Sequence, residues 1–254
     1  MITVRPLESL PTDAAGDTST PSRTAVVTDH TLGAGDARDR HTLGQMRASR
    51  TRQSLSPAAA VRVAAVGGVI GPAAFIGAWM VGSAVTAREY SPIDDAISRL
   101  AAVGADSRPL MTAGFIGFGV CLPVYASALR RVVGGAAWMT AAATGIATLA
   151  VSATPLDRSS TVDTWHGVFA GLGYVTLAAT PLLAVRALLQ QGHRGLAGLG
   201  VVAGAISGIS LALTTSSLPT GLFQRLGLTA ADLWIATSAL AIAGGKLRPT
   251  PTET

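Results

Sequence analysis

The sequence predicts an all-α fold: an integral membrane bundle of six transmembrane helices, with a short extracytoplasmic interfacial helix after the first span. The first observation is composition. Of 254 residues, 49% are hydrophobic and only 13% are charged, whereas charged residues make up about a quarter of a soluble globular domain. The second observation is that the apolar residues gather in six runs, most of them near the roughly 20 residues that a helix needs to cross a bilayer.

The six runs are expected to be the membrane-spanning helices of one domain, residues 58–247. They cover Val61–Thr86, Leu110–Leu129, Val133–Ala153, Trp165–Leu189, Leu196–Ser217 and Ala230–Gly245. The last run is short unless its flanks contribute. Glycines recur every four residues in two places, at Gly200, Gly204 and Gly208 and at Gly167 and Gly171. Small residues at this spacing let membrane helices pack closely, so we expect both faces to contact other helices.

Two polar tails are expected to flank this domain. Residues 1–57 are rich in Thr, Ser, Asp, Arg and Gly and show no sustained apolar pattern. Such a segment cannot bury enough apolar surface to offset its ordering entropy, so we expect a disordered cytoplasmic tail, with a second short tail at residues 248–254. Residues 1–57 also lack the apolar core of a secretory signal peptide. Translation could start at Met1 or at Met46, and the sequence leaves both open.

The basic residues predict the orientation of the chain in the membrane. With a cytoplasmic N-terminus, the basic residues on the inner side are Arg47, Arg50, Arg52, Arg62, Arg130, Arg131, Arg186, Arg194, Lys246 and Arg248, and those on the outer side are Arg88, Arg99, Arg108, Arg158 and Arg225. The positive-inside rule therefore favours cytoplasmic N- and C-termini. The bias toward arginine and alanine suggests a bacterial protein, hence a bacterial plasma membrane. Because the arginines form no aromatic-laced patch, nucleic acid is not an expected partner; membrane lipids are.

In this topology the acidic residues between the two tails all lie at the outer face. They are Glu89, Asp94, Asp95, Asp106, Asp157, Asp163 and Asp232. In the stretch YSPIDDAISRL (90–100), Ser91 is the expected N-cap of the interfacial helix, with Asp94 at its third position. Asp95 and Arg99 are four residues apart and are expected to pair.

Two further aspartates have the spacing of helix caps. Thr229 and Asp232 show capping-box spacing at the start of the sixth run, so Asp232 is interpreted as a cap partner. Asp163 just precedes the fourth run and can cap it. Capping does not account for Asp157, for His166 or for the polar residues of GLFQRLG (221–227), which is expected to be a turn.

Three motifs together resemble a known family. YSPIDDAISRLAAVG, then TPLD shortly before WHG, then GLFQRLG are similar to an uncharacterised family of six-span prokaryotic membrane proteins, domain of unknown function 998. The resemblance covers about Val61–Gly245 and implies the same span count and outer loops. It implies no reaction. The motif positions that we take as candidate ligand-binding residues are Ser91, Asp94, Asp95, Asp157, His166, Gln224 and Arg225.

Ligand binding is the first of three function classes that remain open. The outer polar cap would bind a lipid headgroup or a small polar ligand. Arg225 offers a planar fork to a phosphate or carboxylate, and the aspartates offer acceptors to cationic or hydroxyl groups. The sequence does not indicate the oligomeric state.

The second and third classes are catalysis and transport. A membrane-embedded hydrolase or lipid-modifying enzyme would use His166 and Asp157 in acid–base catalysis or, alternatively, a divalent metal at the outer face. No cofactor is otherwise expected, and the sequence leaves open whether any reaction is catalysed. A transporter of an apolar molecule is the third class. Ion coupling is disfavoured because the central thirds of the six runs contain no Asp, Glu, Lys, Arg or His.

Overall fold

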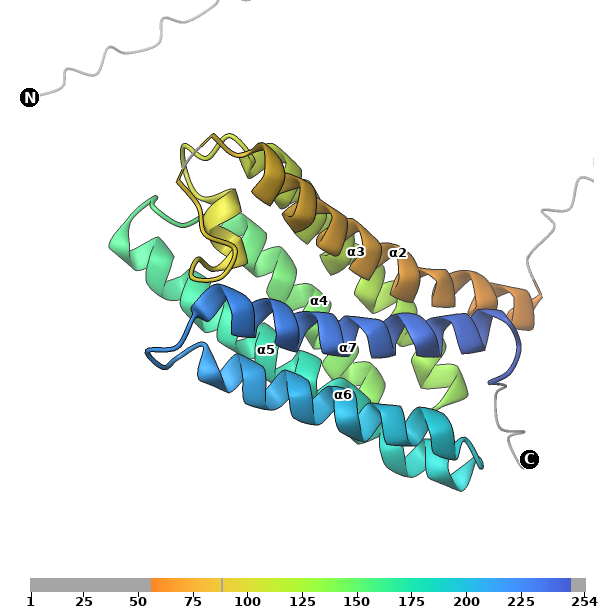
Figure 1. The fold of residues 1–254 in the computed structure, drawn as a ribbon. Helices are drawn as coiled ribbons and strands as arrows, with labels where there is room; N and C mark the ends of the chain where they lie inside the picture. The colour runs from red at the N-terminus through yellow and green to blue at the C-terminus, as the bar shows by residue number, and fades with distance from the viewer. Residues whose placement is uncertain (1–55, 88, 248–254) are drawn as a thin grey trace, which may run out of the picture. The chain divides into compact units, whose positions relative to one another are not determined.

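The computed structural model describes residues 56–87 and 89–247, and within these ranges the chain is helical and contains no strand. The elements are α2 (Pro57–Val85), the 3₁₀ helix η1 (Ile97–Ala101), α3 (Arg108–Val132), α4 (Ala137–Ala153), α5 (Ser160–Gln190), α6 (Arg194–Leu213) and α7 (Thr220–Ala243), drawn in Figure 1. The predicted all-α class is thus confirmed. The predicted disordered tails lie outside the described residues, except for the start of α2.

The six α-helices form a closed ring. Each packs on the next along the chain, and α7 packs back on α2. Short connections join α3 to α4, α4 to α5, α5 to α6 and α6 to α7, so consecutive helices run antiparallel (Figure 1). The 3₁₀ helix η1 packs against α2, α3 and α7 at one end of the ring. We call this the η1 end; it also holds the C-terminus of α2 and the N-terminus of α7. The opposite end is the far end.

Five helices are long and apolar enough to cross a membrane: α2, α3, α5, α6 and α7. The remaining helix, α4, is apolar but has only 17 residues. Large apolar side chains are exposed along every one of the six, for example Val63, Ile116, Ile146, Val175, Ile209 and Leu233. Exposed apolar surface of this extent suits lipid rather than water. The chain is therefore a helical membrane protein, and a sixth span at α4 stays a prediction.

Glycines bring some of the helix backbones into contact. A Cβ at Gly67 of α2 would lie 2.6 Å from the backbone oxygen of Cys121 of α3, so no side chain fits between these helices. At Gly200 of α6 a Cβ would lie 3.0 Å from a backbone oxygen of α5, which confirms close packing there. At Gly167 and Gly171 a Cβ would meet nothing within 4 Å. The expected helix contact on that face of α5 is therefore wrong.

The last helix begins at Thr220, well before the expected start near Ala230. The motif GLFQRLG thus forms the first turns of α7 and is not a turn between helices. Gln224 and Arg225 interrupt the apolar run but not the helix, since both residue types are good helix formers. Both side chains bond to other parts of the protein. The longer helix places Asp232 near its middle. The interpretation of Asp232 as a cap partner is therefore wrong.

The segment after α2 also differs from the expected single helix. Residues 92–95 form a turn, Ala96 is extended (φ −61°, ψ 145°), and only then does η1 begin. Ile97 and Leu100, which an interfacial helix would lay on lipid, are instead buried against the bundle, since each is 1% exposed. An interfacial helix beginning at Pro92 is therefore not observed.

The expected local bonds around Ser91 are partly present. The Asp94 N–H donates to Ser91 Oγ (3.2 Å), as predicted for an N-cap. The Ser91 N–H, however, donates to Asp95 Oδ2 (2.8 Å) rather than to Asp94. The predicted pairing of Asp95 with Arg99 is wrong, because Arg99 Nη1 lies 3.4 Å from Asp157 Oδ1.

Candidate functional site

The structure divides the seven candidate ligand-binding residues into two groups at the η1 end. Those of the first group hold the loops together: Ser91, Asp94, Asp95, Asp157 and Arg225. His166 and Gln224 form the second group, which lines a cavity inside the bundle. The seven therefore do not converge on one pocket.

Arg225 fastens the loop after α2 to the start of α7. Its Nη1 donates to the carbonyl oxygens of Pro92 (2.6 Å), Asp95 (3.2 Å) and Gly221 (3.0 Å). Guanidinium donors in a fixed fork suit several acceptors at once. In this structure the Nη1 donors are therefore taken by backbone oxygens of the protein itself.

Two aromatic rings complete the surroundings of Arg225. Its Cζ lies 5.2 Å from the ring centroid of Trp79 and 5.7 Å from that of Tyr90, and Nη2 donates to the Tyr90 hydroxyl. Burial raises the pKa of the Tyr90 phenol, although the Arg225 charge opposes this shift. Tyr90 is therefore a neutral acceptor, and the loop is tied to both α2 and α7.

Beside this loop lies a pocket of about 200 Å³, which we call the carboxylate pocket. Its lining residues are Thr86, Glu89, Tyr90, Asp95, Arg99, Leu100 and Ala105. Of the seven candidates only Asp95 lines it. Two hydrogen bonds fix the position of Asp95. The Ser91 N–H donates to Asp95 Oδ2, and Arg225 Nη1 donates to the Asp95 carbonyl oxygen. Sequence reasoning placed Glu89 on this face but did not assign it to the site.

Asp157 contacts Arg99, which lines the carboxylate pocket. Their contact joins side chains that are 38% and 54% exposed. Asp157 has a positive φ of 63°, which aspartate tolerates better than most residues. Its N–H donates to Asp163 Oδ1 (3.0 Å). The cap of α5 is Ser159, whose Oγ accepts from the Val162 N–H, so Asp163 supports the Asp157 turn instead.

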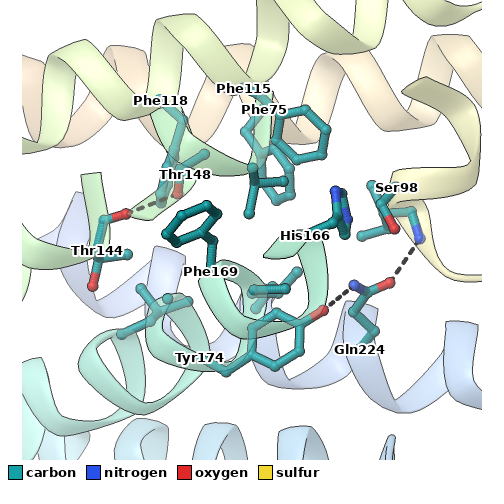
Figure 2. A pocket seen from close by; sticks show the side chains of 16 residues that line it. Phe75, Ser98, Phe115, Phe118, Thr144, Thr148, His166, Phe169, Tyr174 and Gln224 are labelled. Carbon is teal, nitrogen blue, oxygen red and sulfur yellow. Dashed lines mark hydrogen bonds between the residues drawn. The ribbon is translucent and has the colours of Figure 1, made fainter. Parts of the chain in front are cut away.

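The cavity inside the bundle has a volume of about 60 Å³. Figure 2 shows Phe75, Phe115, Phe118 and Phe169 around it, with His166, Ser98, Tyr174 and Gln224 among its polar residues. On this measure a site for one water molecule needs about 10–15 Å³. The cavity therefore has room for a few ordered waters or a small group.

Both candidate residues in this cavity have fixed orientations. Gln224 accepts from the Ile97 N–H (2.7 Å) and donates to the Tyr174 hydroxyl, so it joins η1, α5 and α7 (Figure 2). His166 Nδ1 lies 2.6 Å from the Thr154 carbonyl oxygen, which can only accept. In a neutral ring, Nδ1 then carries the proton and Nε2 is an acceptor. Catalysis by His166 and Asp157 stays a prediction.

A metal site was the other catalytic alternative. Across residues 56–87 and 89–247, no three or more side chains of His, Cys, Asp or Glu lie close enough together to hold a metal ion. No described residue set therefore offers itself as a metal-binding site, and the divalent metal stays a sequence-based alternative.

The position of Asp232 differs most from the sequence-based expectation, which made it a cap partner at the outer face. Asp232 is 1% exposed, and both of its carboxylate oxygens lack a hydrogen-bond partner among the described residues. It lies near the middle of α7, one of the five membrane-length helices. The central part of α7 thus contains an ionisable residue, and the expectation that the central thirds of the spans contain none is wrong. In the sequence, Asp232 stands within the otherwise mostly apolar stretch TAADLWIA (229–236). A helix that begins at Thr220 would have predicted a buried position for it.

The apolar bundle with its polar end defines the class: a multi-pass helical membrane protein. The chain belongs to the family described as Protein of unknown function (DUF998), whose model matches residues 69–241. The resemblance carried by the three motifs is thus confirmed. No curated protein and no solved structure matches the chain.

Proposed function

We propose that this protein lies in a bacterial plasma membrane and binds the cationic part of a lipid headgroup or of a small polar ligand in the carboxylate pocket. The observation that carries the proposal is the convergence of Glu89 and Asp95 on one pocket of about 200 Å³ at the η1 end. Carboxylates that face a pocket favour ammonium and hydroxyl groups. The five loop-holding residues then position the site rather than contact the ligand, apart from Asp95.

Arg99 is the third charged residue of the pocket, and it favours a ligand that also carries a negative charge. Arg99 lines the same pocket and is half-exposed beside Asp157. A guanidinium near two carboxylates complements a zwitterion, with the ammonium on the carboxylates and a phosphate or carboxylate on Arg99. Phosphatidylethanolamine carries both charges in its headgroup and is therefore the probe of choice.

The distribution of charge between the two ends of the ring supports an outward-facing site. Of the described residues, the basic ones at the far end are Arg62, Arg130, Arg131, Arg186, Arg194 and Lys246, and no Asp or Glu lies there. By the positive-inside rule the far end is cytoplasmic. The N- and C-termini are then cytoplasmic, and the carboxylate pocket faces outward.

Native mass spectrometry of the full chain in detergent tests the proposal. The wild type is expected to retain short-chain phosphatidylethanolamine more tightly than phosphatidylglycerol, whose headgroup has no cation. Glu89→Gln and Asp95→Asn keep the side-chain size and remove one charge each. Each should weaken phosphatidylethanolamine binding by about tenfold, the equivalent of about 1.4 kcal/mol.

Asp106→Asn is the matched control, because Asp106 is exposed at the same end but lies outside the pocket. It should leave the affinity unchanged. Equal retention of the two lipids by the wild type, or equal losses in all three variants, would show that the pocket does not recognise a cation.

A further inference from the structure

Asp232 lies at the contact between α7 and α2. It is seven residues from Arg225 and seven from Ala239, and residues two turns apart share a face of a helix. At one end of this face Arg225 stacks on Trp79 of α2. At the other end a Cβ at Gly68 of α2 would lie 2.7 Å from the Ala239 Cβ. The face that carries Asp232 is therefore packed against α2.

Among the described residues, no opposite charge pairs with Asp232. Seven residues of helix rise place Arg225 about 10 Å away along the axis, and its fork is engaged with the loop. The charged or titratable residues of the elements packed on α7 are Arg62 of α2, Arg99 of η1, Arg108, Cys121, Tyr125, Arg130 and Arg131 of α3, Asp163, His166, Tyr174 and Arg186 of α5, and Arg194 of α6. None of them hydrogen-bonds to either Asp232 oxygen.

The chemistry of the carboxyl group limits what can occupy this position. An ionised carboxylate without a partner is costly in an apolar interior, by several kcal/mol even after relaxation. A metal cation would need several oxygen ligands, and the described ranges bring together no group of three His, Cys, Asp or Glu side chains. A proton removes the charge without any further ligand. Ionisable residues inside membrane helices are generally functional.

We infer that Asp232 is a proton-binding site in the interior of the membrane bundle. With the proton bound, the neutral acid is compatible with the packed contact between α2 and α7. Loss of the proton leaves an uncompensated charge in that contact, so it requires water to reach the carboxylate and the two helices to separate there. Ionisation of Asp232 and opening of the α2–α7 contact are thus linked, which provides the element that proton-coupled transport needs.

Labelling with dicyclohexylcarbodiimide tests this inference on the full-length protein in liposomes. This apolar reagent partitions into membranes and modifies a protonated carboxyl group. Since Asp232 is 1% exposed, the reagent reaches it only when the α2–α7 contact opens before the proton is lost, which is the opening that the inference requires. Peptide mass spectrometry is expected to find the adduct on Asp232 at acidic pH, with a yield that falls at least about tenfold toward alkaline pH, the equivalent of about one pH unit of titration. Size-exclusion chromatography at each pH verifies that the protein stays folded.

Two controls define the site. Asp232→Asn mimics the protonated form, so it should fold normally and show no adduct in the same peptide. A water-soluble carbodiimide with an added amine should modify exposed Asp94 and Asp106 in the wild type and leave Asp232 unmodified at acidic pH. Absence of the Asp232 adduct in folded protein at every pH would overturn the inference. A yield that does not change with pH would also overturn it, because it would show that the proton is never released.

Discussion

Removal of the Arg225 side chain tests how the loop after α2 is held. In Arg225→Ala the carbonyl oxygens of Pro92 and Asp95 and the hydroxyl of Tyr90 lose a charged donor, and the stacking on Trp79 is lost. A hydrogen bond from a charged donor contributes about 1.5–3 kcal/mol. Because the acceptors are partly exposed and regain water, we expect a total loss of about 3 kcal/mol rather than the full sum.

The assay is the midpoint of thermal unfolding, measured as the fraction of protein that stays monodisperse in size-exclusion chromatography after heating. A loss of about 3 kcal/mol corresponds to a fall in Tm of about 6–12 °C for a chain of this size. Arg225→Lys keeps the charge but not the fork, so it should recover only part of the loss. Limited proteolysis should show earlier cleavage within residues 89–96 in Arg225→Ala.

Arg99→Ala is the matched control for this experiment. Arg99 makes a half-exposed ion pair with Asp157 at 3.4 Å. Exposed pairs contribute below about 1 kcal/mol, so its Tm should fall by no more than about 4 °C. If Arg225→Ala is no less stable than Arg99→Ala, the bonds of Arg225 to the loop do not hold it, and the reasoning is refuted.

Two other predictions concern packing and sidedness. Gly67→Ala puts a methyl group about where a Cβ lies 2.6 Å from the Cys121 backbone oxygen, so it should destabilise by about 1–3 kcal/mol; Gly77→Ala meets nothing within 4 Å and should not lower Tm. In a Cys121→Ala background, Asp106→Cys should react with a membrane-impermeant maleimide on intact cells, and Arg131→Cys only after permeabilisation. Labelling in the opposite order would reverse the proposed orientation.

Long apolar runs in the sequence predict the positions of the helices. Polar residues inside a helix make its ends hard to predict in this way. The apolar runs over α2, α3, α5 and α6 each have about 20 residues or more, so their length alone predicts these helices. The start of α7 was missed because Gln224 and Arg225 resemble loop residues when their partners are unknown. Those partners lie far away in the chain, at Ile97 and Pro92 among others. A wrong helix start then turned a buried aspartate into an apparent cap.

The candidate site shows the same limit of local reasoning. The bond between Ser91 and Asp94 joins residues three apart and could be predicted from spacing alone. The ion pair of Arg99 with Asp157 joins two separate loops and could not. Glycine spacing has a similar limit, because it shows that a small-residue face exists but not that another helix covers it. Gly200 is covered, and Gly171 is not.

Helix α4 has a consequence for the surrounding bilayer. Its 17 residues rise about 26 Å, some 4 Å less than the roughly 30 Å of a typical hydrocarbon core. If α4 spans the membrane, the hydrocarbon core beside its exposed Met139 and Ile146 must become thinner to match the length of the helix. Thinning of this kind carries a modest cost for every ångström of mismatch. The protein would therefore partition toward the thinner regions of its membrane, with α4 as the element that senses thickness.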